Sequence, residues 1–191
     1  MQLVFATNNL NKIKEVQHLI PKHIKVLSLA DIGCHEDIPE TQDTIKGNAI
    51  QKVDYIKTHY GYDCFADDTG LEVTALHGEP GVYSARYAGP QRNADDNMTK
   101  LLKNLENHSN RSAQFKTVIA LQINGQLHTF TGICKGEITT NKSGTEGFGY
   151  DPIFKAVGHT KTFAQISLEE KNQIGHRGKA VKKLVAFLNT L

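Results

Sequence analysis

The pair Asn124-Gly125 restricts the fold of this chain more than any other feature, because it separates two long runs rich in β-forming residues. The first run covers residues 113–123 and the second covers residues 126–134. Asn-Gly is the preferred sequence for a two-residue hairpin turn, since both central positions take positive φ. We therefore expect two long antiparallel strands, with residues 136–140 as a third extended piece of the same sheet.

Strands and helices alternate in the first half of the chain. Apolar residues recur with strand or helix spacing, and turn residues or prolines separate the segments. The expected elements are a strand over 2–6, a helix ending at Pro21, a strand near 24–28, a helix over 43–60, a strand over 63–66 and later helices over 94–106 and 177–190. We expect an α/β fold in which helices flank an elongated mixed β-sheet, with residues 1–191 forming a single domain of two lobes around a central active-site cleft.

Composition limits the class of protein. The 191 residues are 39% hydrophobic and 22% charged, as in ordinary globular domains, and the net charge of +2 is too small to favour nucleic acid or a membrane surface as a partner. The three cysteines form no paired motif, so we expect reduced thiols rather than disulfides or a zinc site. The N-terminus is apolar only over residues 3–6, which predicts a strand rather than a signal peptide. We expect a soluble, cytoplasmic protein.

A polar turn, Thr7-Asn8-Asn9-Leu10-Asn11-Lys12, joins the first expected strand to its helix. A helix N-terminus directs backbone N–H groups and the positive end of the helix dipole toward one point, which favours phosphate. Lys12 adds a mobile cation, and Thr7 and Asn9 add neutral donors. The spacing of a P-loop is absent. The alternative is a helix cap rich in Asn, which is a favoured capping residue.

Two adjacent carboxylates, Asp67 and Asp68, follow the expected strand over 63–66. Mg²⁺ is usually held by one or two carboxylates together with substrate phosphates, so Asp68 and the loop residue Glu40 are candidate ligands. Asp67 would brace the strand end by accepting backbone N–H bonds, and Thr69-Gly70 would form a tight turn that exposes Asp68. The alternative is a solvated acidic turn.

Two further clusters suit a nucleobase. The glycines on either side of Phe148 would let a flat ligand approach the backbone, while Phe148 stacks on it and Asp151 hydrogen-bonds its edge. Lys171 and the pair His176-Arg177 supply donors for the carbonyl oxygens of a purine or for phosphate. The alternatives are a hairpin loop with a buried aromatic ring and a solvated basic face.

Six collinear stretches resemble the inosine triphosphate pyrophosphatase family, whose members hydrolyse non-standard purine nucleoside triphosphates. These stretches span essentially the whole chain: FATNNLNK, ETQDTIKGNAIQK, ADDTGLEV, GVYSARYAG, GFGYDPIF and EEKNQIGHRGKA. Each is a modest signal alone, and six in the same order are specific. The resemblance implies Mg²⁺-dependent conversion of ITP, dITP or XTP to the nucleoside monophosphate and pyrophosphate. It also implies a homodimer.

The resemblance further implies a role for each matched residue. Glu40 and Asp68 would bind Mg²⁺, with Asp68 also acting as general base, and Thr69 would contact substrate. The triphosphate would be held by Lys52 and by Thr7, Asn8, Asn9, Leu10, Asn11 and Lys12. The base pocket would be formed by Phe148, Gly149, Tyr150, Asp151, Lys171, His176 and Arg177.

Two rival functions stay open at the level of sequence. A non-catalytic nucleotide-binding module would keep the phosphate turn and the base pocket without needing Glu40 and Asp68. A Maf-like nucleotide pyrophosphatase would act on other bases, including pyrimidines, and the stretches around Phe148 and His176-Arg177 favour the purine enzyme over it.

Overall fold

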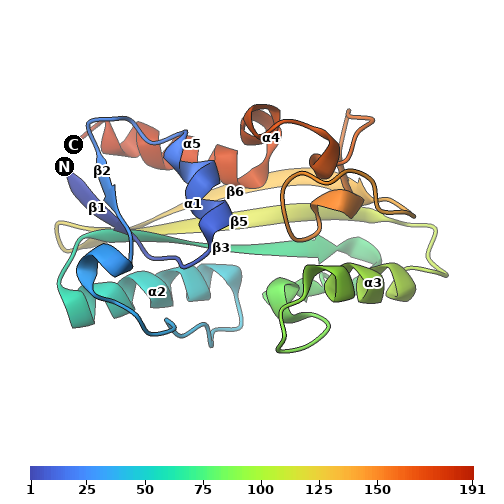
Figure 1. Cartoon of the computed structure of the whole chain (residues 1–191), viewed down its shortest axis with the longest axis horizontal. Helices are drawn as coiled ribbons and strands as arrows, with labels where there is room; N and C mark the ends of the chain where they lie inside the picture. The colour runs from blue at the N-terminus through green and yellow to red at the C-terminus, as the bar shows by residue number, and fades with distance from the viewer. The chain divides into compact units, whose positions relative to one another are not determined.

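The computed structural model describes all 191 residues, and the chain separates into two compact units (Figure 1). Unit 1 consists of Met1–Asp68, Thr117–Gly132 and Arg177–Leu191, and unit 2 of Thr69–Lys116 and Ile133–His176. Three strands pass from one unit into the other, namely β3 (Cys64–Val73), β5 (Ser112–Ile123) and β6 (Gln126–Ile138). Each unit is therefore assembled from separate stretches of sequence.

Unit 1 contains a parallel set of strands with helices on both faces. Its remaining elements are β1 (Gln2–Phe5), α1 (Leu10–Gln17), β2 (Lys25–Leu27), a 3₁₀ turn (Ala30–Ile32), α2 (Ile45–Tyr60) and, from its second residue, α5 (His176–Leu188). Strand β1 pairs in parallel with β2 and with β3. In Figure 1, α2 lies on one side of these strands and α1 and α5 on the other.

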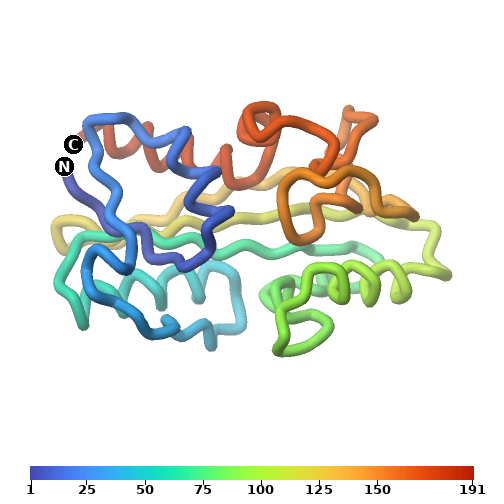
Figure 2. The backbone as a smooth tube through the Cα atoms, in the orientation of Figure 1, coloured from blue at the N-terminus to red at the C-terminus, as the bar shows by residue number.

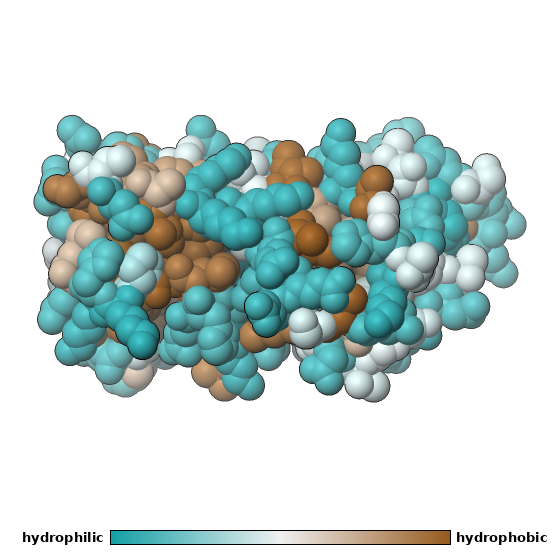
Figure 3. Space-filling view, turned by 90° about the horizontal axis from the view of Figure 1, so that it is seen from above, coloured by the Kyte–Doolittle hydropathy of each residue, from teal (hydrophilic) through white to brown (hydrophobic).

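The core of unit 1 lies between its strands and the helices α1 and α5. Its buried members include Phe5 and Phe65 on neighbouring strands, whose rings stack with centroids 4.5 Å apart, together with Val16, Val181 and Leu184. Several other members are only half-buried. Hydrophobic residues accordingly reach the surface of unit 1 at the left of Figure 3, on the side that carries these two helices.

Unit 2 has its own core, built around α3 and the parts of the shared strands that belong to this unit, namely residues 69–73, 112–116 and 133–138. Its other elements are β4 (Pro80–Gly81), α3 (Ala94–Asn104), β7 (Phe154–Ala156), α4 (Leu168–Ile174) and four 3₁₀ turns (Thr74–Leu76, Ser84–Arg86, Asp151–Ile153 and Phe163–Gln165). Leu101, Phe115, Ile138, Phe154 and Phe163 are among the residues that fill this core. Strand β4 pairs antiparallel with β3, and β7 pairs antiparallel with β6.

The expected mixed sheet with flanking helices is confirmed. The strand order is β2-β1-β3-β5-β6-β7, with β4 paired to β3, and the sheet contains both parallel and antiparallel pairs. The Asn-Gly hairpin is confirmed too, because Asn124 (φ 50°) and Gly125 (φ 76°) are the two residues between β5 and β6 and both have positive φ. No helix combines the length and the apolar character needed to cross a membrane.

The prediction of a strand end at the acidic pair is wrong. Strand β3 continues from Cys64 to Val73, and Figure 2 shows the backbone passing through this stretch without a turn. Thr69-Gly70 is therefore part of the strand and not a tight turn. The reason is that the carboxylate of Asp67 is neutralised by cations from other segments, so that charge inside the strand does not end it.

Two other boundaries differ from the expectation. Strand β6 runs unbroken to Ile138, so residues 136–140 are not a separate strand, and the C-terminal part of β6 pairs with β7, while β6 also pairs with β5. Gly136 misleads the sequence prediction, since a Cβ there would lie 2.3 Å from the Lys155 carbonyl O and the glycine permits this close pairing. Helix α1 ends at Gln17 rather than at Pro21 because the next residues form a tight turn onto the Val16 carbonyl.

Candidate active site

The turn after β1 has the geometry of a capped helix N-terminus. The Asn9 Oδ1 accepts hydrogen bonds from the backbone N–H groups of Asn11 (3.0 Å) and Lys12 (3.3 Å), and Thr7 Oγ1 accepts one from Asn9 N–H (3.2 Å). The alternative of an Asn helix cap is thus confirmed for Asn9. Thr7 and Lys12 are half-buried, whereas the other residues of the turn are exposed, namely Asn8, Asn9, Leu10 and Asn11.

Lys12 is held in place, contrary to the mobile cation expected from sequence. Its Nζ lies 2.9 Å from Oδ1 of Asp67 and 3.4 Å from the carbonyl O of the same residue, and its side chain is 14% exposed. Burial lowers the pKa of Lys12, and the charge of Asp67 opposes that change. The ammonium is therefore fixed beside β3.

Asp67 braces its strand through cations, which corrects the expectation of backbone N–H partners. It is 1% exposed, with Oδ1 paired to Lys12 and Oδ2 accepting a hydrogen bond from Arg177 Nε at 2.9 Å. Burial acts to raise the pKa of Asp67, but Lys12 and Arg177 hold it below its ordinary value. The lowered pKa keeps Asp67 ionised at neutral pH and makes its carboxylate a weaker base than an ordinary aspartate.

Lys52 on α2 connects the two acids expected at the metal site. Its Nζ donates to Glu40 Oε1 at 2.7 Å, to the carbonyl O of Asp67 at 2.7 Å and to Asp68 Oδ1 at 3.4 Å. Burial opposes the charge of this ammonium, but Asp68, Glu40 and Asp67 together raise the pKa of Lys52. Burial also raises the pKa of Asp68, with Lys52 acting in the opposite direction. Glu40 and Asp68 thus converge on one buried cation.

The pair Glu40 and Asp68 fits the ligand set of Mg²⁺. Both offer carboxylate oxygens, they come from different segments, and both contact the same Lys52 Nζ. No group of three or more His, Cys, Asp or Glu side chains is arranged to hold a metal ion in this chain. Two carboxylates completed by substrate phosphates and water is the arrangement that Mg²⁺ commonly uses.

Arg177, expected in the base pocket, has its guanidinium in unit 1. Its Nε donates to Asp67 and its Nη1 pairs with Glu15 of α1, and all three side chains are at least 95% buried. Burial acts against the charge, but Asp67 and Glu15 raise the pKa of Arg177. Contact between Arg177 and a base stays a prediction, and the structure assigns this residue a bracing role.

In unit 2, Asp151 holds the loop that presents Phe148. Asp151 is 2% exposed, and its Oδ2 accepts hydrogen bonds from the backbone N–H of Phe148 at 2.7 Å and from Lys171 Nζ at 2.5 Å. Gly147 has φ +73°, and a Cβ there would lie 2.1 Å from Asp151 Oδ2, so only glycine permits this approach. The contact between Asp151 and the edge of a base stays a prediction.

Lys171 lies among aromatic rings. Its Nζ is 4.9 Å from the ring centroid of Phe148 and 5.7 Å from that of Phe163. His176 stacks on Phe115 with ring centroids 4.5 Å apart and is 4% exposed. Phe148 itself is half-buried, which leaves part of its ring accessible to a ligand.

The remaining expected site residues of unit 2 support this arrangement. Tyr150 is 4% exposed, and its hydroxyl donates to the carbonyl O of Ser84 at 2.8 Å, so it anchors the loop. Gly149 has φ +64° and forms part of the bend after Phe148. Thr69 is half-buried in β3 and is the first residue of unit 2.

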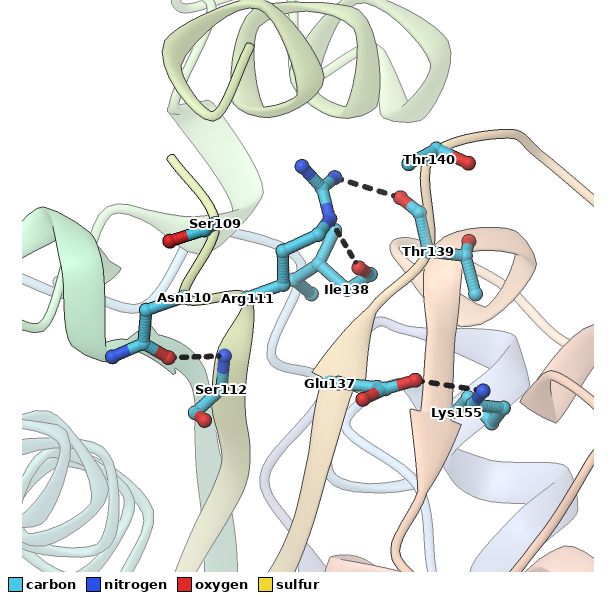
Figure 4. Close-up of a pocket in the computed structure, with 9 residues that line it drawn as sticks. All are labelled: Ser109, Asn110, Arg111, Ser112, Glu137, Ile138, Thr139, Thr140 and Lys155. Atoms are coloured by element: carbon cyan, nitrogen blue, oxygen red, sulfur yellow. Dashed lines mark hydrogen bonds and ion pairs between the residues drawn. The ribbon is translucent and has the colours of Figure 1, made fainter. Parts of the chain in front are cut away.

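A polar pocket of about 460 Å³ in unit 2 contains none of the expected site residues (Figure 4). Arg111 donates there to the carbonyl oxygens of Ile138 (2.6 Å), Thr139 (2.8 Å) and Leu105 (3.2 Å), and Lys155 pairs with Glu137 at 2.7 Å. Both cations are thus used to join the ends of β5, β6 and β7. The pocket is lined by Ser109, Asn110, Arg111, Ser112, Glu137, Ile138, Thr139, Thr140 and Lys155.

Sequence reasoning missed Glu15 and Asn48. Glu15 is a buried acid in an otherwise polar part of α1, and its position three residues after Lys12 places both on one helix face. Asn48 is 1% exposed and contacts Asp68. Their burial is known only from the structure, so no comparable signal for either residue is present in the sequence.

Comparison with known proteins identifies the family. The model of the Ham1 family matches residues 3–187. A dITP/XTP pyrophosphatase of Flavobacterium johnsoniae is 68% identical over 188 residues, covering 98% of each chain. The solved structure of the Staphylococcus aureus Ham1 protein aligns with a TM-score of 0.91 at 41% identity, covering 100% of this chain and 99% of that one, and a HAM1 protein from Coxiella burnetii aligns with a TM-score of 0.93 at 38% identity over the full length of both. The resemblance inferred from the six stretches is confirmed, and the chain belongs to the Ham1 family.

Proposed function

We propose that this protein is a nucleoside triphosphate pyrophosphatase that hydrolyses non-standard purine nucleotides (ITP, dITP and XTP) to the monophosphate and pyrophosphate. The observation that carries the proposal is the convergence of Glu40 and Asp68 on Lys52 Nζ, beside the Lys12–Asp67 pair. The name of the 68%-identical relative, dITP/XTP pyrophosphatase, agrees with it. Such an activity would remove these nucleotides from the cytoplasmic pool before they enter DNA or RNA.

The residues of unit 1 would hold the triphosphate and move one proton. Lys12 and Lys52 supply positive charge for the phosphate oxygens. Asp68, whose pKa is raised by burial, accepts a proton from water as that water attacks the α-phosphorus; the bond from the α-phosphorus to its bridging oxygen breaks, and pyrophosphate leaves. Mg²⁺ held by Glu40 and Asp68 would neutralise phosphate charge and lower the pKa of the attacking water.

The residues of unit 2 would select the base. Phe148 stacks on the purine, and the donors Lys171 and His176 pair with the 6-keto oxygen of hypoxanthine or xanthine. ATP has an amino group at that position, so a donor would face a donor. Leaving a buried polar group unpaired in this way discriminates strongly between substrates.

A nucleotide panel tests the proposal. Purified protein with Mg²⁺ is given ITP, dITP, XTP, dUTP, UTP or ATP, and pyrophosphate is detected separately from orthophosphate. We expect pyrophosphate from the three keto-purines and little from ATP. Preferred hydrolysis of UTP or dUTP would favour the Maf-like alternative, and absence of turnover with every nucleotide would favour a binding module. The homodimer implied by the resemblance is tested by light scattering coupled to size-exclusion chromatography.

A further inference from the structure

Asn48 lies one turn before Lys52 on α2, and its side-chain amide joins two segments of unit 1. The amide Oδ1 accepts a hydrogen bond from the backbone N–H of Gln42 at 2.9 Å, and Nδ2 donates to Asp68 Oδ2 at 3.4 Å. The residue is 1% exposed. A buried amide is stable only when its donor and acceptor sides are both paired, and here each side pairs with a different segment.

The two segments are those that carry the acids of the proposed metal site. Gln42 comes two residues after Glu40, and the other partner is Asp68 itself. A shift of the Asn48 amide would therefore move the loop of Glu40 relative to β3. Lys52 also contacts both acids, but its ammonium repels a metal cation, whereas the neutral amide can keep its hydrogen bonds when a metal is present.

A second attachment of the same loop to α2 involves Gln51. Its Oε1 accepts a hydrogen bond from Thr41 N–H at 2.9 Å, and its Nε2 donates to Thr41 Oγ1 at 2.8 Å. This two-point contact fixes the residue that follows Glu40. Gln51 has no partner on β3, so it attaches only the loop of Glu40, and it provides a comparison for the bridge made by Asn48.

We propose that Asn48 is a positioning residue that sets the separation of Glu40 and Asp68 as metal ligands. The inference rests on the proposed function, because that function assigns the two acids to the metal. Partners that orient metal ligands through hydrogen bonds typically change metal affinity by about 10- to 100-fold when removed. Asn48 contacts Asp68 and the loop that carries Glu40, whereas Gln51 contacts that loop alone.

Titration of the full chain with Mn²⁺ alone, followed by electron paramagnetic resonance, tests the inference without turnover. Asn48→Leu is expected to weaken Mn²⁺ binding about 10-fold, and Gln51→Leu less. Asn48→Ala replaces the first variant if leucine prevents folding. Glu40→Gln and Asp68→Asn identify the signal from the site, since each removes a ligand.

Asn97 of unit 2 provides a matched control. It is 4% exposed on α3, its Oδ1 accepts from Ala88 N–H at 2.6 Å, and its Nδ2 donates to the carbonyl O of Ala85 at 3.0 Å. Asn97→Leu removes the same kind of buried bridge, but no metal ligand is attached to it. We expect a lowered melting temperature and unchanged Mn²⁺ affinity, whereas Asn48→Leu changes both.

The outcomes separate this inference from the proposed function. The positioning role is overturned if Asn48→Leu binds Mn²⁺ as tightly as the wild-type protein, or if Asn97→Leu loses as much Mn²⁺ affinity as Asn48→Leu. The proposed function is upheld independently if the wild-type protein releases pyrophosphate from XTP. Mn²⁺ binding that is unaffected by Glu40→Gln and Asp68→Asn removes the two-acid site and the inference with it. Failure of the wild-type protein to release pyrophosphate, with the Asn48 effect present, overturns the function alone.

Discussion

The two units stabilise their site residues in different ways. In unit 1, buried side chains form a network of ion pairs in which positive and negative charges alternate. Lys12 pairs with Asp67, Asp67 with Arg177, and Arg177 with Glu15. In unit 2, a buried pair of Lys171 and Asp151 lies among aromatic rings. A chain of charges suits a highly charged ligand, and a ring-lined surface with few charges suits a flat one.

The two units also differ in how firmly their own contacts hold the candidate site residues in place. Lys12, Lys52 and Arg177 are paired with carboxylates of the protein itself, so the protein sets the positions of these cations before any phosphate binds. In unit 2, Asp151 fixes the Phe148 loop, while the ring of Phe148 remains half-buried. We infer that unit 1 contributes rigid electrostatics and unit 2 an accessible surface for stacking.

Asp68→Asn is expected to have the largest effect of the variants that test the difference between the two units. It removes the proposed proton acceptor and a metal ligand, so we expect kcat with XTP to fall by about 10³-fold or more, while nucleotide binding stays measurable by calorimetry. Asp54→Asn, at an exposed position of α2, is the control and should behave as the wild type. Turnover close to wild type in Asp68→Asn would reject the assignment of the base.

Asp67→Asn tests whether the buried charges of unit 1 depend on one another. It leaves Lys12 and Arg177 without a full counter-charge, so the free energy of unfolding should fall by about 3–5 kcal/mol in urea titrations. Asp151→Asn leaves one cation, Lys171, and should lose less. A larger loss in Asp151→Asn would reverse the comparison between the units.

Phe148→Ala tests the proposed role of unit 2 in binding the base. Loss of stacking on one base should weaken binding of XTP by about 1–3 kcal/mol, and the affinity for Mn²⁺ should not change, because the proposed metal ligands lie in unit 1. Calorimetry with an XTP analogue and the Mn²⁺ titration provide the two readouts. Tyr62→Ala removes an exposed aromatic ring from unit 1 and is the control. A changed Mn²⁺ affinity would contradict the division of roles.

Glu36→Gln probes an exposed acid of unit 1 and should have the smallest effect. Hydrogen bonds from the hydroxyls of Tyr60 (2.5 Å) and Tyr55 (3.0 Å) lower the pKa of Glu36 to about 2. Because the folded pKa lies below the unfolded value of about 4.3, the ionised form stabilises the fold above that pH and the effect is lost as pH falls toward 2. As pH falls from about 4.3 toward 2, the midpoint of urea unfolding should fall less steeply in Glu36→Gln than in the wild-type protein. An identical fall in the two proteins would contradict the contact of Glu36 with Tyr55 and Tyr60.

Local signals in the sequence were sufficient for much of the fold. The hairpin follows from Asn124-Gly125, and the helix expected over 43–60 is α2, capped by Thr44 and ended by Gly61 in the left-handed region. Periodicity and turn chemistry act over a few residues, so one sequence contains them. The family resemblance then supplied roles that no local pattern carries.

Features that depend on distant partners could not be predicted in this way. Strand β3 runs through two carboxylates because Lys12 and Arg177 neutralise Asp67, and neither cation is near it in sequence. The role of Asn48 also depends on other segments, because its partner Gln42 comes before α2 in the sequence and its partner Asp68 comes after it. The motifs suggested Arg177 and Asp151, which brace their surroundings in the structure. They did not suggest Glu15 or Asn48.

The discontinuous make-up of the units has a consequence for synthesis on the ribosome. Arg177, which completes the charge balance around Asp67 and Glu15, emerges after more than nine-tenths of the chain. Until then Lys12, which we propose binds phosphate, lacks its finished surroundings, and a nascent chain stopped before the last helix would keep two buried acids short of a cation. Activity is therefore expected to arise late in synthesis, because a fragment that ends before Arg177 lacks one cation of this buried cluster.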